Sequence, residues 1–254
     1  MRILVTNDDG VESPGISVLA QALRSLGDVV VVAPDGDRSG VAHSLSIHSP
    51  VRIRELRGRP VTTYVCSGTP ADCVVVGAYE VFKTLPDLVV SGINRGANAG
   101  DDITYSGTIA AANEALLIGV PSIAVSLAIA WPISDEEPQW ETAAQCAVEL
   151  AAKAGDFTLP ATTLLNLNVP NVEAALLRGV LLTSQSRKRY KDRTDRRTDP
   201  RGETYVWIWG SHNAETIEEG SDLAALRDGY ASVTPITIDR TDDVTLARLR
   251  VSPA

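Results

Sequence analysis

The chain has 254 residues, of which 44% are hydrophobic and 22% are charged, and its mean hydropathy is +0.02. These values exclude disordered and fibrous proteins and are typical of a globular chain with one large or two small domains. The net charge of −9 argues against binding to nucleic acid or an anionic membrane through overall charge. Three scattered cysteines without a CxxC pair, and an N-terminus without a signal-peptide pattern, predict a cytoplasmic protein.

The first part of the chain alternates strand and helix patterns. Residues 3–6, ILVT, and the continuous apolar run 29–33 have strand patterns. The helix pattern between them begins with Ser13 as N-cap and Pro14 at the first helical position, and it ends at Gly27. Strands that are apolar without interruption are buried on both faces, which is typical of parallel sheets. This segment therefore predicts a βαβ unit.

The alternation continues as far as residue 170. The predicted elements are helices at 70–82, 108–118 and 140–154 and strands at 87–92, 121–127 and 163–169. Residues 115–134 carry no charge, but Gly119 and Pro121 interrupt them, so we expect no membrane-spanning helix. These patterns predict an α/β fold in residues 1–170, namely a three-layer, doubly wound, mostly parallel, Rossmann-like sheet.

Two segments depart from this alternation. Short β-type runs on either side of Arg57–Pro60 predict a hairpin inserted between the second strand and the second helix. Beyond Pro170, strand patterns at 180–185, 204–210 and 230–238 predict a smaller β-rich C-terminal part. We expect this part, residues 171–254, to serve oligomerisation.

An extended arm is predicted near residues 186–205. Residues 187–201 contain eight basic and three acidic side chains, a local charge of +5 that leaves −14 on the rest of the chain. The segment is too polar to bury itself, and the alternating apolar pattern of 204–210 follows it. We interpret the arm as a subunit contact, and an arm that binds a phosphate-bearing ligand or nucleic acid is the alternative.

The loops that follow the strands are the predicted ligand site, because ligands bind at the carboxyl ends of strands in an open parallel sheet. Asp8 and Asp9 directly follow the first strand. Adjacent, partly buried carboxylates repel each other, and a divalent cation is the simplest means of holding them together. The alternative is that Asp8 caps a turn and Asp9 is solvated.

Two further loops add neutral oxygen donors. Ser39 follows the second strand, and Asn94 follows the strand at 87–92. A set of oxygen donors without a histidine or cysteine cluster suits Mg²⁺ or Mn²⁺, with Ca²⁺ as a further candidate, rather than Zn²⁺. We therefore expect one divalent ion per subunit. The first loop lacks the GxGxxG pattern of a dinucleotide fold, and the chain has no GxSxG motif of a serine nucleophile.

A phosphate site is predicted where the helix at 108–118 begins. Ser106, Gly107 and Thr108 combine hydroxyls with the free N–H groups and the dipole of a helix N-terminus, all of which favour a phosphate. A plain N-cap role for Ser106 is the alternative. His43, four residues beyond Ser39, is either an acid or phosphate donor in the same crevice or a structural histidine.

Longer blocks of sequence run from the first strand almost to the C-terminus. They read RILVTNDDGVESPGI, VVAPDGDRSGVAHSLSI, CSGTPADCV, DLVVSGINRGANAGDDITYSGTIAAANEA, GVPSIAVSL, LLNLNVP, DPRGETYVWIWG and DGYASVTPI. These blocks resemble the stationary-phase survival protein SurE family of metal-dependent 5′-nucleotidases. The resemblance implies a cytoplasmic dimer or tetramer that hydrolyses nucleoside 5′- and 3′-monophosphates, and in some members short polyphosphate.

The resemblance also assigns site residues. It implies that the metal ligands are Asp8, Asp9, Ser39 and Asn94, the four donors that the loops themselves suggest. It implies a phosphate pocket formed by Gly40, Asn98, Ser106, Gly107 and Thr108. It further implies that subunits exchange the arm as an extended hairpin. Two departures are Ser46, where many members have threonine, and the loop at 131–140, which matches no family motif.

We therefore predict a divalent-metal-dependent phosphomonoesterase of nucleoside monophosphates in which Asp8 and Asp9 are catalytic. Attack by water and an aspartyl-phosphate intermediate are both compatible with the sequence. The alternative functions are a non-catalytic nucleotide or polyphosphate sensor and a phosphatase of a non-nucleotide ester. We expect self-association to a dimer or tetramer, and we expect neither a membrane nor a nucleic-acid partner.

Overall fold

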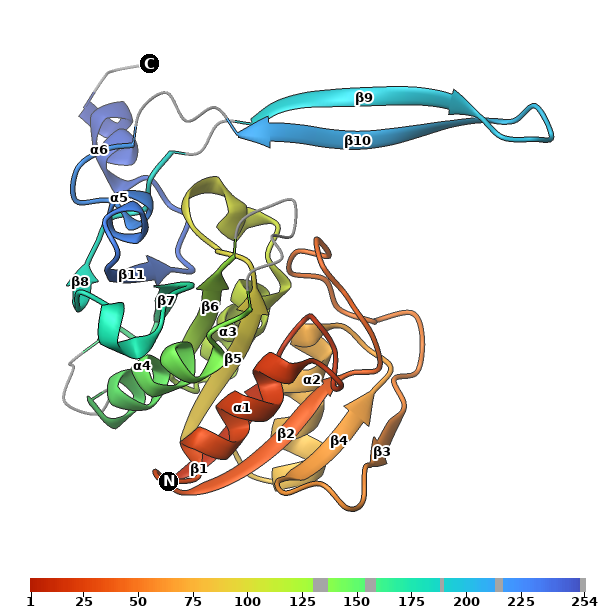
Figure 1. Ribbon diagram of the computed structural model, residues 1–254, viewed down its shortest axis with the longest axis vertical. Helices are drawn as coiled ribbons and strands as arrows, with labels where there is room; N and C mark the ends of the chain where they lie inside the picture. The colour runs from red at the N-terminus through yellow and green to blue at the C-terminus, as the bar shows by residue number, and fades with distance from the viewer. Residues whose placement is uncertain (130–136, 154–158, 188–189, 213–216, 252–254) are drawn as a thin grey trace.

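The computed structural model describes residues 1–129, 137–153, 159–187, 190–212 and 217–251 (Figure 1). The strands are β1 Arg2–Thr6, β2 Asp28–Pro34, β3 Ile53–Glu55, β4 Thr62–Cys66, β5 Leu88–Arg95, β6 Ser122–Ala128, β7 Thr163–Pro170, β8 Val180–Leu182, β9 Tyr190–Thr198, β10 Thr204–His212 and β11 Ala231–Thr237. The helices are α1 Pro14–Leu23, α2 Pro70–Val76, α3 Gly107–Leu117, α4 Trp140–Lys153, α5 Asp222–Arg227 and α6 Asp243–Val251. The shorter helical segments are the π-helix η1 Gly77–Phe82 and the 3₁₀ turns η2 Gly100–Thr104 and η4 Ala174–Leu176.

The main sheet has nine strands in the order β3-β4-β2-β1-β5-β6-β7-β11-β8. The strands from β4 to β7 in this order are parallel, whereas β3 and β11 run antiparallel to their inner neighbours. The prediction of a mostly parallel, doubly wound α/β sheet is confirmed. The order reverses between β1 and β5, so the loops after these two strands lie at the topological switch point, where ligands bind in such sheets.

Helices cover both faces of the sheet because its central strands are apolar on both faces. On one face Ile3 and Val5 of β1 belong to a core that includes α1 and α4. On the other face Leu4 belongs to a core with residues of α2 and α3. All three side chains are fully buried. The three layers thus follow directly from the alternating directions of side chains along buried strands.

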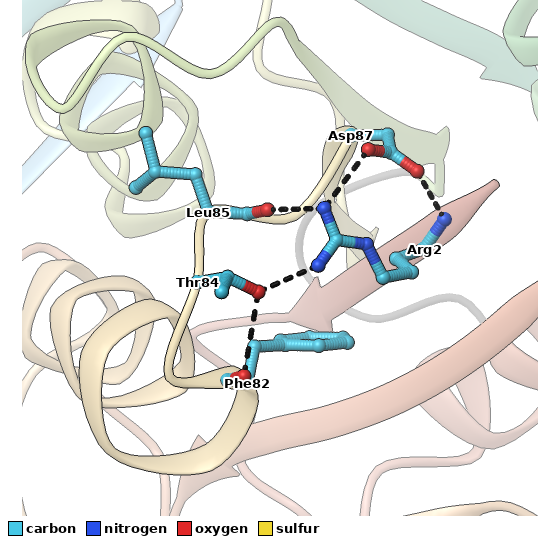
Figure 2. A network of polar contacts seen from close by, with 5 residues as sticks. All are labelled: Arg2, Phe82, Thr84, Leu85 and Asp87. Carbon is cyan, nitrogen blue, oxygen red and sulfur yellow. Dashed lines mark hydrogen bonds and ion pairs between the residues drawn. The ribbon is translucent and has the colours of Figure 1, made fainter.

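Arg2 ties the start of β1 to the segment before β5 (Figure 2). Its backbone N–H donates to Asp87 Oδ2 at 2.7 Å. Its guanidinium donates to Leu85 O at 2.9 Å and to Thr84 Oγ1 at 2.5 Å, and the Thr84 hydroxyl donates to Phe82 O at 3.4 Å (Figure 2). These contacts align β1 with β5 at the end of the sheet opposite the predicted site.

The predicted helices begin where the sequence places them, but two of them end earlier than predicted. Thr69 and Asp72 form a capping box at the start of α2, with Asp72 N–H donating to Thr69 Oγ1 at 3.1 Å. The helix predicted over 70–82 is α-helical only to Val76 and continues as a π-helix. The helix predicted to close at Gly27 ends at Leu23, and its last turn relaxes into shorter-range hydrogen bonds.

The hairpin predicted around Arg57–Pro60 is present as β3 and β4, and β4 adds to the parallel part of the sheet beside β2. Beyond Pro170, β11 and β8 extend the same sheet. Two short helices, α5 and α6, also occur in this region, where the sequence predicts strands alone. In the described ranges no helix is both long and apolar enough to cross a bilayer.

The arm is an antiparallel hairpin of β9 and β10 that projects from the body of the molecule (Figure 1). Thr204 pairs with Thr198, and the turn is closed by Asp199 Oδ1, which accepts from the backbone N–H groups of Arg201 and Glu203. The sequence predicts an arm ending near residue 205. In the structure β10 is the second strand of the arm, so the arm continues to His212.

Candidate active site

The loop after β1 is a tight turn at the switch point. Asn7 Nδ2 donates to Gly10 O at 2.9 Å and closes the turn. Gly10 has a φ of +95°, and a Cβ there would lie 3.0 Å from the carbonyl carbon of Gly36. Only glycine satisfies both conditions without strain. The loop after β1 is therefore packed directly against the loop after β2.

Asp8 is held against the start of α3. Its side chain is buried, and Oδ1 accepts a hydrogen bond from Thr108 Oγ1 at 2.6 Å. A Cβ at Gly107 would lie 2.7 Å from the Cβ of Asp8. Gly107 is thus required for the close approach of helix and carboxylate, and the Thr108 hydroxyl is directed at Asp8.

Asp9 contacts the end of β5. Its Oδ2 accepts the backbone N–H of Arg95, at the end of β5, at 3.0 Å. The two adjacent carboxylates are therefore fixed by different elements, Asp8 by α3 and Asp9 by β5. Neither carboxylate has an ion pair in the described part of the chain.

Both carboxylates bind protons more tightly than an ordinary aspartate. Burial raises the pKa of Asp8. The pKa of Asp9 is raised from 3.8 to about 6, mainly by burial and to a smaller extent by repulsion from Asp8. Asp37, in the loop after β2, adds further repulsion that raises the pKa of each. A cation bound between these groups would reverse the effect by stabilising the charged forms.

Ser39 is linked to Asp8 through its neighbours. The backbone N–H of Arg38 donates to Asp8 O at 2.8 Å, which sets the loop after β2 beside the loop after β1. Ser39 donates from both its backbone N–H and its hydroxyl to Asp37 Oδ1, at 2.7 and 2.6 Å. Because the hydroxyl hydrogen is directed at Asp37, the hydroxyl oxygen keeps lone pairs for a cation.

Asn94 lies one residue before the Arg95 amide that holds Asp9. A register shift between Ser91 and Asn94 marks a bulge in β5, and bulges redirect the side chains that follow them. Asn94 Nδ2 donates to Gly96 O at 2.9 Å. This contact assigns the amide nitrogen and leaves Oδ1 as the acceptor available to a ligand.

The donor set fits a hard divalent cation. Two carboxylates, one hydroxyl and one amide oxygen are the ligand types that Mg²⁺, Mn²⁺ and Ca²⁺ prefer. The described residues contain no group of three or more His, Cys, Asp and Glu side chains arranged to hold a metal ion. Two adjacent carboxylates, Asp8 buried and Asp9 half-buried, repel each other and have no ion pair in the described part of the chain. A cation between them would offset this repulsion.

The predicted phosphate residues lie at the first turn of α3 and around it. Ser106 is the N-cap of α3, and its Oγ accepts the N–H of Ile109 at 3.1 Å, as the alternative interpretation of Ser106 states. Its hydroxyl hydrogen remains available to a ligand. The Thr108 hydroxyl, in contrast, orients Asp8. Gly40 has a φ of +74° and open space beside it.

His43 contacts a buried acid on α3. Its Nε2 lies 2.8 Å from Glu114 Oε2, and the N–H of the preceding Ala42 donates to Tyr105 O at 3.1 Å. Both contacts attach the loop after β2 to the segment that leads into α3. His43 thus has a structural partner, and among the residues that the structure describes no hydrogen bond or ion pair joins its side chain to the four candidate metal ligands.

Asn98 is anchored from three sides. Its backbone N–H donates to Asn168 Oδ1 at 2.8 Å, and its Nδ2 donates to Ser126 Oγ at 2.9 Å. Its carbonyl oxygen accepts from Asn166 Nδ2 at 2.8 Å and Asn168 Nδ2 at 3.0 Å. The sequence alone does not predict these partners, although two asparagines at alternate positions in the otherwise apolar run LLNLNVP are a visible signal.

Asp222 is a second anchor, and no pattern in the sequence indicates it. Its side chain is fully buried, and Oδ2 accepts the N–H of Gly100 at 2.8 Å. Its Oδ1 accepts the N–H of Ser186 at 3.0 Å, the Ser186 hydroxyl, and the N–H of Leu223 at 2.7 Å. One carboxylate therefore joins the loop after β5 to the base of the arm. In the sequence this acid belongs to no motif, and it is the structure that places it in the first turn of α5.

A model of the family described as Survival protein SurE matches residues 3–192. The chain belongs to the SurE family. It is 49% identical over 242 residues to the 5′-nucleotidase SurE of Syntrophotalea carbinolica, covering 95% of this chain and 93% of that protein. It is 46% identical over 250 residues to the 5′-nucleotidase SurE of Geobacter sulfurreducens, covering 98% and 93%.

The fold of this SurE family member is also found among solved structures. The crystal structure of the SurE protein from Aquifex aeolicus superimposes with a TM-score of 0.84 at 40% identity, and the match covers 98% of each chain. The residues Asp8, Ser39 and Asn94 all fall within the matched region 3–192.

Proposed function

We propose that this protein is a divalent-metal-dependent phosphomonoesterase that hydrolyses nucleoside 5′-monophosphates to a nucleoside and inorganic phosphate. One observation carries the proposal: the Asp8–Asp9 pair lies at the switch point of the sheet, with Asp8 bonded to the first turn of α3 and Asp9 to the end of β5. The 5′-nucleotidase names of its relatives support the substrate class.

Asp8, Asp9, Ser39 and Asn94 would hold the metal ion, for which we propose Mg²⁺ or Mn²⁺, with Ca²⁺ as a further candidate. When bound, the ion supplies polarisation of the phosphoryl oxygens and lowers the pKa of a bound water. The N-terminus of α3 and the hydroxyl of Ser106 bind the phosphate and stabilise its developing charge.

We propose attack by water rather than by an aspartate. Thr108 fixes Oδ1 of Asp8 and Gly107 packs against its Cβ, so Asp8 is oriented as a ligand. Asp9 is less buried and orients the water. Rapid acid quench of a single turnover with radiolabelled 5′-AMP should yield no phosphorylated protein. A labelled aspartyl-phosphate that forms and decays at the turnover rate would contradict this route.

A substrate panel tests the function. Phosphate release should occur with 5′-AMP and 3′-AMP and more slowly with tripolyphosphate, should be negligible with glucose 6-phosphate, and should require Mg²⁺ or Mn²⁺. Excess EDTA should abolish it. Comparable turnover of glucose 6-phosphate would indicate a non-nucleotide phosphatase instead, and nucleotide binding without turnover would indicate a sensor.

We propose that the arm, within the C-terminal part 171–254, assembles two or four subunits in the cytoplasm. The apolar side chains Val206, Trp207 and Ile208 of the arm are 49%, 61% and 81% exposed. A neighbouring subunit would cover this surface, and its net negative charge would attract the basic strand β9. Replacing residues 190–212 by a short glycine linker should lower the mass measured by light scattering. An unchanged mass would exclude this role.

A further inference from the structure

The turn that carries Ser39 lies in a long loop, residues 35–52, that contains no helix or strand. Val41 N–H donates to Arg38 O at 3.4 Å and closes a β-turn. Ser39 and Gly40 are its central residues, and the φ of +74° at Gly40 is typical of the third residue of a type II turn. The turn has a defined shape, so its place in the site depends on the contacts that hold its two ends.

The two ends of this turn are attached to different elements. At the first end, the N–H of Arg38 donates to Asp8 O at 2.8 Å, directly at the candidate metal site. At the second end, the N–H of Ala42 donates to Tyr105 O at 3.1 Å, just before α3. The side chain of the next residue, His43, then contacts α3 itself. The turn is therefore held between the loop after β1 and α3.

The contact of His43 is with a buried carboxylate. Its Nε2 lies 2.8 Å from Oε2 of Glu114, whose side chain is 8% exposed, against 26% for His43. Among the described residues, His43 is the hydrogen-bonding and ion-pairing partner of this carboxylate. Buried neighbours on α3, such as Ala111 and Ala115, belong to an apolar core. A buried carboxylate is costly and adds nothing to such a core, so its contact with the loop is what requires explanation.

Ala42, between the turn and His43, has an unfavourable backbone conformation. Its φ is +52°, in the left-handed region that residues with a Cβ rarely adopt. Such a conformation persists where surrounding contacts hold it, and it is found most often at functional sites. Here the contacts are the bond from Ala42 N–H to Tyr105 O and the bond between His43 and Glu114.

We propose that Glu114 is a positioning residue that acts through His43 to set the turn of Ser39 at the metal site. The contact holds Ala42 in its left-handed conformation, so the hydroxyl oxygen of Ser39 is in place before a cation binds. Neither Glu114 nor His43 touches the cation or the substrate. The inference rests on the proposed function, because it takes Ser39 as a metal ligand.

Binding of Mn²⁺ to the full-length protein, stripped of metal with EDTA and measured by calorimetry, tests this role. Glu114→Leu removes the acceptor and should raise the Kd about tenfold, as is typical for loss of a group that orients a metal ligand. Glu114→Gln keeps an oxygen acceptor for His43 and should raise the Kd no more than about threefold, because a neutral hydrogen bond is only moderately weaker than a charge-assisted one. Glu149→Leu, on the exposed side of α4, is the matched control and should leave the Kd unchanged.

Two further measurements distinguish positioning from a general loss of stability. In metal-free Glu114→Leu, amide hydrogen exchange should become faster in residues 38–43 and stay unchanged in β1 and β5. Adding Ala42→Gly to Glu114→Leu should recover part of the Mn²⁺ affinity, because glycine adopts the left-handed conformation without strain. At saturating Mn²⁺ the kcat of Glu114→Leu for p-nitrophenyl phosphate should match that of the unmodified protein.

Four results would overturn the inference. They are an unchanged Kd in Glu114→Leu, equal losses in the leucine and glutamine variants, no recovery with Ala42→Gly, and a kcat that stays low at saturating Mn²⁺. Each of these leaves the phosphomonoesterase function of the unmodified protein intact. Failure of the unmodified protein to bind Mn²⁺ would instead refute the metal site on which the proposed function depends.

Discussion

Replacement of Asp9 by asparagine should stabilise the metal-free protein, although it removes a proposed catalytic group. Burial and the neighbouring Asp8 raise the pKa of Asp9 from 3.8 to about 6. At about 1.4 kcal/mol per pKa unit, a shift of about two units sets an upper limit of about 3 kcal/mol for the cost of ionising Asp9 in the folded state. Because the side chain is partly exposed, we expect a gain of about 1–2 kcal/mol.

The sign of the pH dependence follows from the raised pKa. The folded protein holds the Asp9 proton more tightly than the unfolded chain does, so the cost is absent below pH 3.8 and complete above about pH 6. The contribution of Asp9 to the free energy of unfolding of the metal-free protein should therefore increase as the pH falls from 6 towards 4. Asp9→Asn should lack that contribution.

Urea denaturation in EDTA at pH 7.5 and pH 5, followed by the same titrations in Mn²⁺, measures both effects. The unmodified protein should gain stability from Mn²⁺ in proportion to RT ln(1 + [Mn²⁺]/Kd), whereas Asp9→Asn should gain little. Asn can still accept the Arg95 N–H bond, so the variant keeps its contact with β5. If Asp9→Asn is less stable than the unmodified protein in EDTA at pH 7.5, the electrostatic reasoning is wrong.

Three further predictions concern groups that act on this site from nearby. Thr108→Val should lower kcat/KM by about 10²-fold because Asp8 loses its orienting donor, and Thr108→Ser should restore most of it; equal activity of the two variants would contradict this role. Gly107→Ala should weaken Mn²⁺ binding measured by calorimetry, since its Cβ would lie 2.7 Å from that of Asp8. Asp222→Ala should lower the free energy of unfolding by about 3 kcal/mol or more, measured in urea, because it strands several buried donors; a loss below about 1 kcal/mol would contradict that account.

Local patterns in the sequence determine the layered core of this protein. Continuous apolar runs such as 29–33 and 88–90 predict strands buried on both faces, and Ser13-Pro14 and Thr69-Pro70 predict where helices begin. These signals are reliable because they depend on burial and capping within a few residues. They also place Asp8 and Ser39 in loops after strands, and Asn94 just after the strand predicted at 87–92, which the structure extends to Arg95. The parallel fold brings these residues to one end of the sheet.

Only the tertiary structure decides which hydrogen bonds those loop residues make. Thr108 is directed at Asp8 rather than left for a phosphate, and Asn98 is anchored by Asn168, 70 residues away. Asp222 holds Gly100 across 122 residues, and β10 pairs with β9 to complete the arm. The reason is physical. A buried polar group requires a hydrogen-bond partner, and the fold supplies that partner from a distant part of the chain. The neighbouring residues in the sequence therefore do not predict which partner it will have.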